Sequence, residues 1–134
     1  MSFLLDSNTW ISLLRRQDAK VLAALDQHPA DEILLCSVVL AELWYGAERS
    51  GRREANYLLV DALQGKYRSL PFDDAAAREY AVIRATLAQQ GNPIGPNDTM
   101  IAAIARSYGV TLVTNNVGEF RRVSGLAIED WQSA

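Results

Sequence analysis

The sequence is poor in the residues that several common kinds of chemistry require. It has one cysteine, Cys36, and one histidine, His28, among 134 residues. A single cysteine excludes an internal disulfide, and the apolar run around Cys36 indicates a buried strand thiol. His28 precedes a proline and has no serine or cysteine motif to serve, which argues against triad catalysis. A glycine-rich loop with a lysine for nucleotide phosphates is also missing.

Long apolar runs and excess positive charge are missing as well. No run is long enough to span a bilayer, and the N-terminus lacks the pattern of a signal peptide. We therefore expect a cytoplasmic protein without membrane contact. The net charge of −3 argues against bulk attraction to nucleic acid but leaves room for a local basic rim. The length suits one domain, residues 1–134, with a real core.

Strand and helix patterns alternate along the chain. Strands are predicted at residues 3–6, 32–36, 68–72, 110–114 and 126–129. Helices are predicted at residues 8–15, 18–27, 37–48, 53–63 and 75–90, and from residue 97 or 98 to Gly109. Ser37 is the expected N-cap of the third helix, and Asp73 or Asp74 that of the fifth. This alternation predicts a three-layer α/β/α domain with a mainly parallel sheet.

Three carboxylates stand alone among apolar residues. Asp6 follows the first strand, Glu42 lies in a helix that is apolar on nearly every side, and Asp98 opens an apolar helix. Each has an ordinary explanation. Asp6 could cap a helix, Glu42 could pair with a buried partner, and Asp98 could face the helix dipole. Because Glu42 has no basic neighbour within a helical turn, its burial would be costly without a partner or a bound cation.

The parallel topology predicts where these acids meet. Ligands bind in the crevice at the carboxyl ends of parallel strands, and Asp6 and the segment after Thr114 both lie there. That segment adds amide oxygens and Glu119, a fourth candidate acid. Carboxylates without nearby cysteine or histidine form a hard, all-oxygen site that favours Mg²⁺ or Mn²⁺ over zinc.

Four short motifs in order resemble a known family. They are Leu5-Asp6-Ser7-Asn8, Ala41-Glu42-Leu43 with Tyr45-Gly46-Ala47, Asp98 with Ile101-Ala102-Ala103, and Thr114-Asn115-Asn116 with Glu119-Phe120. This order is similar to that of PIN-domain ribonucleases and, among them, the VapC toxins of bacterial type II toxin–antitoxin systems. Ser7 stands where the family more often has threonine, which keeps the hydroxyl. The segment from Gly91 to Asp98 further resembles VapC proteins that cut transfer RNA in the anticodon region.

The resemblance implies a magnesium-dependent endoribonuclease, with manganese as a substitute. Asp6, Glu42 and Asp98 are then expected to bind the catalytic metal, with Glu119 holding a second ion or the attacking water. The fourth acid varies within the family, so the metal contact falls to either Glu119 or the Asn116 position. Ser7, Thr114 and Asn116 are expected to orient the acids. Metal-activated water would leave a 5′-phosphate and a 3′-hydroxyl.

Partners also follow from the resemblance. It implies a homodimer and a VapB-like antitoxin whose tail occupies the acidic groove, with operator DNA bound only through the complex. The apolar helical hairpin of residues 38–63 is a plausible docking surface. RNA needs attraction from outside the acidic pocket. The candidate phosphate contacts are Arg15, Arg16, Arg49, Arg52, Arg53, Arg121 and Arg122.

Two other functions stay open on the residues alone. A receiver-like phosphoacceptor domain also uses aspartates at strand ends with Mg²⁺. It would need paired acids after the first strand and a lysine near the last, and Lys20 and Lys66 lie in neither place. A non-catalytic interaction module folded around a structural ion is the second alternative, and the intact set of acids argues against it.

Overall fold

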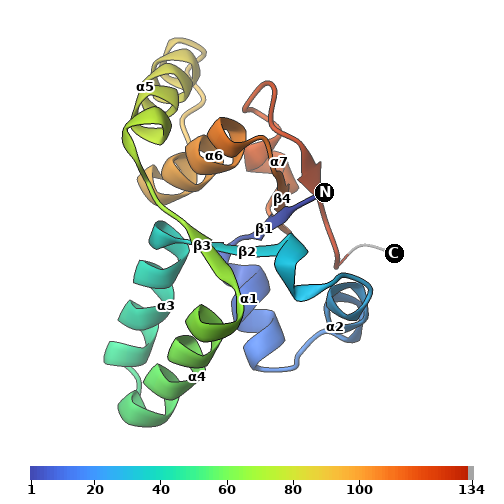
Figure 1. The fold of residues 1–134 in the computed structure, drawn as a ribbon. Coiled ribbons are helices and arrows are strands. Elements are labelled where there is room, and N and C mark those ends of the chain that lie inside the picture. Colours follow the sequence, from blue (N-terminus) through green and yellow to red (C-terminus); the bar gives the residue numbers. More distant parts are fainter. Residues whose placement is uncertain (133–134) are drawn as a thin grey trace.

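The computed structural model describes residues 1–132 and builds them around one five-stranded sheet (Figure 1). The strands are β1 (Phe3–Leu5), β2 (Ile33–Cys36), β3 (Arg68–Leu70), β4 (Thr111–Val113) and β5 (Ile128–Glu129). The helices are α1 (Ser7–Leu14), α2 (Ala19–Asp26), α3 (Ser37–Glu48), α4 (Arg53–Lys66), α5 (Asp74–Gln89), α6 (Pro96–Tyr108) and α7 (Val117–Phe120). A 3₁₀ turn, η1 (Ala30–Glu32), precedes β2.

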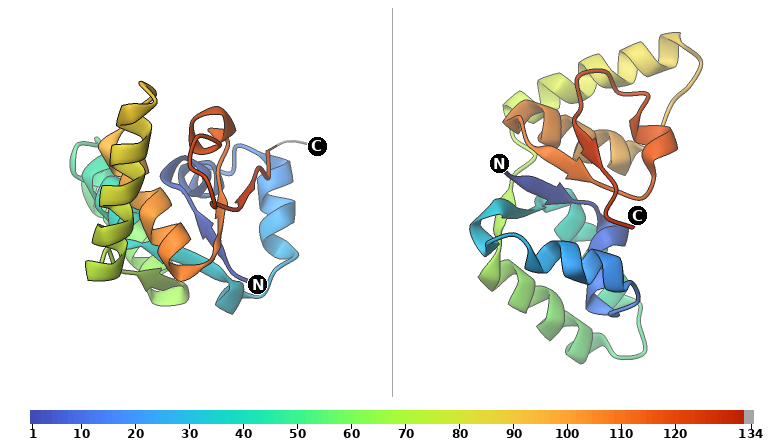
Figure 2. Two further views of the ribbon diagram at one scale, coloured as in Figure 1. Left: turned by 90° about the horizontal axis from the view of Figure 1, so that it is seen from above. Right: turned by 90° about the vertical axis from the view of Figure 1, so that its right-hand side faces the viewer.

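The sheet has the order β3-β2-β1-β4-β5, and every pair of neighbouring strands is parallel. Helices α5 and α6 cover one face, while α1, α3 and α4 cover the other (Figures 1 and 2). Every residue of β1 and β2 is buried, as expected for strands covered on both faces. The predicted three-layer α/β/α fold with a parallel sheet is thereby confirmed.

Several element boundaries differ from the sequence predictions. Helix α6 begins at Pro96, because proline at the first position costs no hydrogen bond, and Gly95 is its N-cap. The N-cap of α3 is Cys36 and makes no side-chain cap bond, so the prediction for Ser37 was wrong. Asp73 caps α5 as predicted, by accepting the Ala76 amide at 2.9 Å. Helix α7 and the turn η1 were not predicted, since both are too short to show periodicity.

The structure also bears on the Cys36 thiol and on membrane-spanning segments. Cys36 is fully buried at the end of β2, as its apolar run indicated. Among the described residues, no helix is both long enough and apolar enough to cross a membrane.

The burial of the core predicts that the same substitution lowers stability by very different amounts at two helical valines. Val39 on α3 is fully buried, whereas Val82 on α5 is 54% exposed. Val39→Ala should lower the free energy of unfolding by about 2 kcal/mol, because it removes two methyl groups from a packed site. Val82→Ala makes the same change in helix propensity and should cost almost nothing. Urea unfolding measures both, and equal losses would contradict this account of the core.

Candidate active site

The site lies at the edge of the sheet where the parallel strands end. Strand β1 ends at Leu5 and β4 at Val113, and these two residues pair in register. The next residue on each strand, Asp6 or Thr114, therefore reaches the same place. The Asp6 amide continues the ladder by donating to the Val113 carbonyl at 3.0 Å. Register alone thus brings together side chains 108 residues apart.

Hydroxyl groups hold the Asp6 carboxylate from both sides. Its Oδ1 accepts the Thr9 amide at 2.9 Å and the Thr9 hydroxyl at 2.7 Å. Its Oδ2 accepts the Thr114 hydroxyl at 2.6 Å. Burial raises the pKa of Asp6, and these hydrogen bonds oppose that rise. The capping interpretation of Asp6 is correct, since its side chain caps α1 while facing the crevice.

Thr9 is a contact that the sequence predictions missed. It is buried and supplies two of the three hydrogen bonds that the Asp6 carboxylate accepts. A usable signal was present, because an N-cap aspartate accepts from the backbone two or three residues on, and a hydroxyl there can add a second bond. Thr9 therefore joins Ser7, Thr114 and Asn116 among the groups that orient the acids.

Glu42 is more open than the sequence indicated. It is only partly buried, because its neighbours Ala41, Tyr45 and Gly46 on α3 are exposed. The burial of Glu42 expected from a helix that is apolar on nearly every side is therefore only partial. The Ser7 hydroxyl donates to Glu42 Oε1 at 2.7 Å and links the start of α1 to the middle of α3. A partner from outside the helix thus exists, and it is a neutral hydroxyl.

Asp98 reports the proximity of the other acids. It lies in the first turn of α6 and is half-buried. Burial, followed by the charges of Glu42, Asp6 and Glu119 in that order, together raise its pKa to about 6. The favourable helix dipole is therefore outweighed at this position. The four predicted acids share one electrostatic environment although they come from four separate segments.

Glu119 is joined to Asp6 through a chain of hydrogen bonds. The Asn116 side chain donates from Nδ2 to Glu119 Oε2 at 2.9 Å. The Asn116 backbone amide donates to the Thr114 hydroxyl oxygen at 2.9 Å, and that hydroxyl in turn donates to Asp6. Asn116 thus orients Glu119 on α7, a helix that the sequence did not predict.

The donor chemistry of this edge fits a hard divalent cation. All four acids offer carboxylate oxygens, which Mg²⁺ and Mn²⁺ prefer. Within residues 1–132, no group of three or more acid, histidine or cysteine side chains lies close enough together to hold a metal ion. Carboxylates repel one another, so close approach of these acids requires a cation between them.

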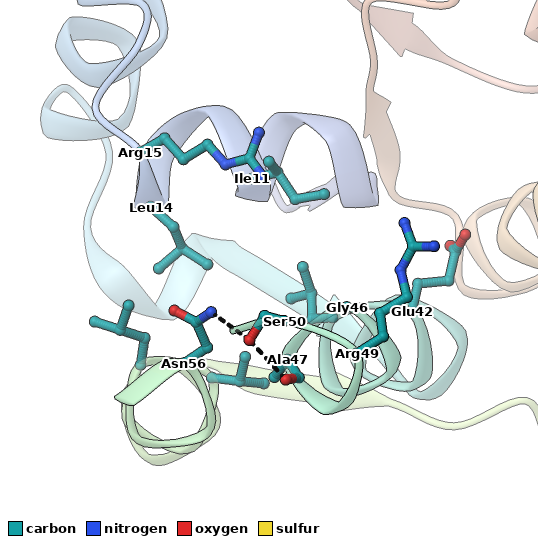
Figure 3. A pocket seen from close by; sticks show the side chains of 12 residues that line it. Ile11, Leu14, Arg15, Glu42, Gly46, Ala47, Arg49, Ser50 and Asn56 are labelled. Atoms are coloured by element: carbon teal, nitrogen blue, oxygen red, sulfur yellow. Dashed lines mark hydrogen bonds between the residues drawn. The ribbon is translucent and has the colours of Figure 1, made fainter. Parts of the chain in front are cut away.

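A pocket of about 390 Å³ opens beside Glu42, between α1, α3 and α4. Its wall is largely apolar and includes Leu43 and Val60. Arg15, just after α1, and Arg49, just after α3, line it together with Glu42 (Figure 3). Two of the predicted phosphate contacts thus share a pocket with Glu42.

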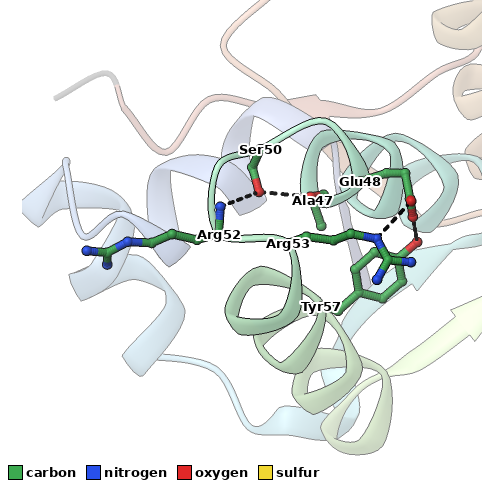
Figure 4. A network of polar contacts seen from close by, with 6 residues as sticks. All are labelled: Ala47, Glu48, Ser50, Arg52, Arg53 and Tyr57. Carbon is green, nitrogen blue, oxygen red and sulfur yellow. Dashed lines mark hydrogen bonds and ion pairs between the residues drawn. The ribbon is translucent and has the colours of Figure 1, made fainter.

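The other arginines predicted to contact phosphate differ in their bonding and exposure. Arg53 pairs with Glu48 at 2.8 Å, and Tyr57 donates to the same carboxylate, while Arg52 extends away from them (Figure 4). Arg53 is therefore engaged at the α3–α4 turn, and the prediction that it flanks the crevice lacks structural support. Arg122 bonds to the Pro93 carbonyl at 3.1 Å. Arg16 and Arg121 are exposed.

Comparison with known proteins agrees with this fold and site. A family model for the PIN domain matches residues 3–126. A tRNA(fMet)-specific endonuclease VapC from Shigella flexneri is 42% identical over 131 residues, covering 98% of each chain. Ribonuclease VapC2 from Haemophilus influenzae is 37% identical with the same coverage. The crystal structure of DNA-bound VapBC from Salmonella typhimurium superposes with a TM-score of 0.91 at 38% identity, covering 98% of each chain.

The parallel α/β/α fold and its acidic edge therefore define a PIN domain. Within that class, the chain belongs to the VapC family of toxin–antitoxin proteins, since the similarity extends over nearly its whole length.

The raised pKa of Asp98 predicts an unusual stabilising substitution. Its folded value of about 6 lies above the ordinary 3.8, so ionisation above pH 6 destabilises the metal-free fold. This penalty fades as the pH falls through 6 towards 4. In chelator at pH 7.5, Asp98→Asn should therefore raise the free energy of unfolding by about 1–2 kcal/mol, with little gain near pH 4.5.

A matched control is available for this experiment. Asp74 occupies the first turn of α5, as Asp98 does in α6, but it is exposed and outside the acidic edge. Asp74→Asn should give no such pH-dependent gain in urea unfolding. A gain for Asp98→Asn that is the same at both pH values would show that charge repulsion is not its cause.

Proposed function

We propose that this VapC-family protein is a metal-dependent endoribonuclease, the toxin of a toxin–antitoxin pair, which hydrolyses phosphodiester bonds in RNA. The observation that carries the proposal is the convergence of Asp6, Glu42, Asp98 and Glu119, expressed in the raised pKa of Asp98. Clustered carboxylates that cannot neutralise one another are a functional arrangement more often than a structural one. The printed names of the relatives, ribonuclease and endonuclease, support the same activity.

Asp6, Glu42 and Asp98 would hold Mg²⁺, with Mn²⁺ as a substitute, and Glu119 would complete the site or orient the attacking water. When bound, a divalent ion lowers the pKa of water and neutralises charge on the phosphate. The hydroxyls of Thr9 and Thr114 fix the Asp6 oxygens, and Ser7 fixes Glu42. These bonds stabilise the ionised carboxylates that a cation needs.

The proposed mechanism also predicts the nucleophile and the ends of the cleaved RNA. No histidine lies at this edge within the described residues, since His28 pairs with Glu32 before β2. Because the attacking group would be metal-activated water, the ribose 2′-hydroxyl would not be the nucleophile. The products would carry a 5′-phosphate and a 3′-hydroxyl.

Transfer RNA, cut in the anticodon region, is the proposed substrate. Support comes from the name of the 42% identical relative, a tRNA(fMet)-specific endonuclease. The pocket beside Glu42 adds a physical reason, because Arg15 and Arg49 offer cations next to acids that would otherwise repel phosphate. Arg15 makes no ion pair among the described residues, so its guanidinium is available.

The proposed partner is a VapB-like antitoxin, with operator DNA bound only through the complex. Structurally similar relatives have been crystallised as VapBC complexes, including DNA-bound VapBC from Salmonella typhimurium. An antitoxin arginine reaching the four acids would substitute for the charge of the metal and so inhibit the protein. We also propose a homodimer for the free protein.

RNA cleavage tests the proposal directly. Antitoxin-free protein should cut an end-labelled pool of total transfer RNA into discrete fragments with Mg²⁺ and should cut nothing in chelator. Asp98→Asn should reduce cleavage by about 100-fold or more, the scale on which a lost electrostatic contact lowers kcat. Asp74→Asn should retain full activity. New 5′ ends that can be labelled by a kinase only after phosphatase treatment carry 5′-phosphates, whereas ends labelled without that treatment carry 5′-hydroxyls.

The contrary outcomes point to different functions. Cleavage that persists in chelator would contradict the metal-dependent mechanism. Folded protein that binds Mn²⁺ but cuts neither transfer, messenger nor ribosomal RNA would favour the non-catalytic interaction module.

A further inference from the structure

The loop between α5 and α6 delivers Asp98 to the site. Both ends of this loop, residues 91–95, are fastened by hydrogen bonds. The Asn92 amide donates to the Leu87 carbonyl at 2.9 Å, and the Thr99 hydroxyl donates to the Gly95 carbonyl at 2.8 Å. Between these anchors lies Pro93, which has no N–H to donate. The middle of the loop is therefore held by the packing of Ile94 against the core and by the groups that bind its carbonyl oxygens.

Arg122 binds the middle of the loop from the other side of the site. Its Nη1 donates to the Pro93 carbonyl at 3.1 Å, across 29 residues of sequence. Arg122 is half-buried, whereas its neighbour Arg121 is exposed. The Arg122 side chain borders a small cavity with Ile83 and Leu87 of α5, which confines its stem.

The backbone of the same residue contacts the other half of the site. The Arg122 amide donates to the Glu119 carbonyl at 3.1 Å and closes the turn that follows α7. One residue is thus bonded both to the turn that carries Glu119 and to the loop that leads into Asp98. No shared strand or helix joins these two segments, since α7 follows β4 and the loop follows α5.

We propose that Arg122 is a positioning residue that sets the spacing between the Asp98 and Glu119 carboxylates and thereby the affinity of the site for a divalent ion. This inference rests on the proposed metal-dependent function. It replaces the sequence-based interpretation of Arg122 as a phosphate contact, because its guanidinium already binds a backbone carbonyl.

Three variants distinguish a positioning role of Arg122 from a role as a phosphate contact. Arg122→Met keeps an apolar stem but removes the donors, and Arg122→Lys keeps a cation with one donor group. Arg78→Met removes an exposed α5 arginine outside the site and serves as the control. Electron paramagnetic resonance of Mn²⁺ measures metal binding without RNA. Arg122→Met should bind Mn²⁺ about 10-fold more weakly, as expected when a group supporting metal ligands is lost. Arg122→Lys should keep part of the affinity that Arg122→Met loses. The control Arg78→Met should bind Mn²⁺ as tightly as the wild-type protein.

Two further measurements exclude a purely structural or RNA-binding role. Amide hydrogen exchange of peptides covering residues 91–98 should be faster in Arg122→Met, with unfolding in urea little changed. The activity of Arg122→Met should recover at saturating metal, with KM for RNA unchanged. Unchanged Mn²⁺ affinity with a raised KM would instead overturn the positioning role and restore the phosphate contact. If Arg122→Met does not fold, Arg122→Lys decides by the same comparison.

The failure of this inference can be told apart from that of the proposed function. If wild-type protein binds Mn²⁺ and cuts RNA while folded Arg122→Met and Arg122→Lys match it, only the positioning role is wrong. If folded wild-type protein neither binds Mn²⁺ nor cuts RNA, the metal-dependent function is wrong and the inference falls with it.

Discussion

The hydrogen bonds that hold the Asp6 carboxylate are the contact on which the rest of this site depends. One side chain starts α1, closes the junction between β1 and β4, and presents an acid at the edge of the sheet. Thr9 and Thr114 make this compatible with burial, since hydroxyl donors stabilise a charge that the core would otherwise disfavour. The structural and functional interpretations of Asp6 are therefore two consequences of the same geometry.

Repulsion among the four carboxylates opposes their gathering at this edge of the sheet. The sheet order places β1 and β4 side by side at the centre, and α3 and α6 bring Glu42 and Asp98 to the same edge. The fold thus concentrates negative charge at this edge, and the raised pKa of Asp98 reflects its burial first and then the charges of the other three acids. Crowded carboxylates of this kind lower the stability of the fold, a trade between stability and activity that is common at functional sites.

The arginine side chains, in contrast, are spread over several environments. Arg53 finds an acid close in sequence, Glu48, and is engaged at the surface. Arg15 and Arg49 meet instead across a pocket formed by separate helices, beside Glu42. Arg122 bonds to a backbone carbonyl and links the loop before Asp98 to the turn after Glu119. Arginines that look equivalent along the chain therefore have three different environments, and each environment implies a different role.

The sequence by itself determined the strand and helix order, the parallel three-layer fold and the four acids, because apolar periodicity and isolated carboxylates are local features. Only the tertiary structure decided the Thr9 bonds to Asp6, the exposure of Glu42, the separation of the arginines and the formation of α7. These depend on strand register and on which helix packs against which. Such contacts join residues distant in sequence, so no local pattern encodes them.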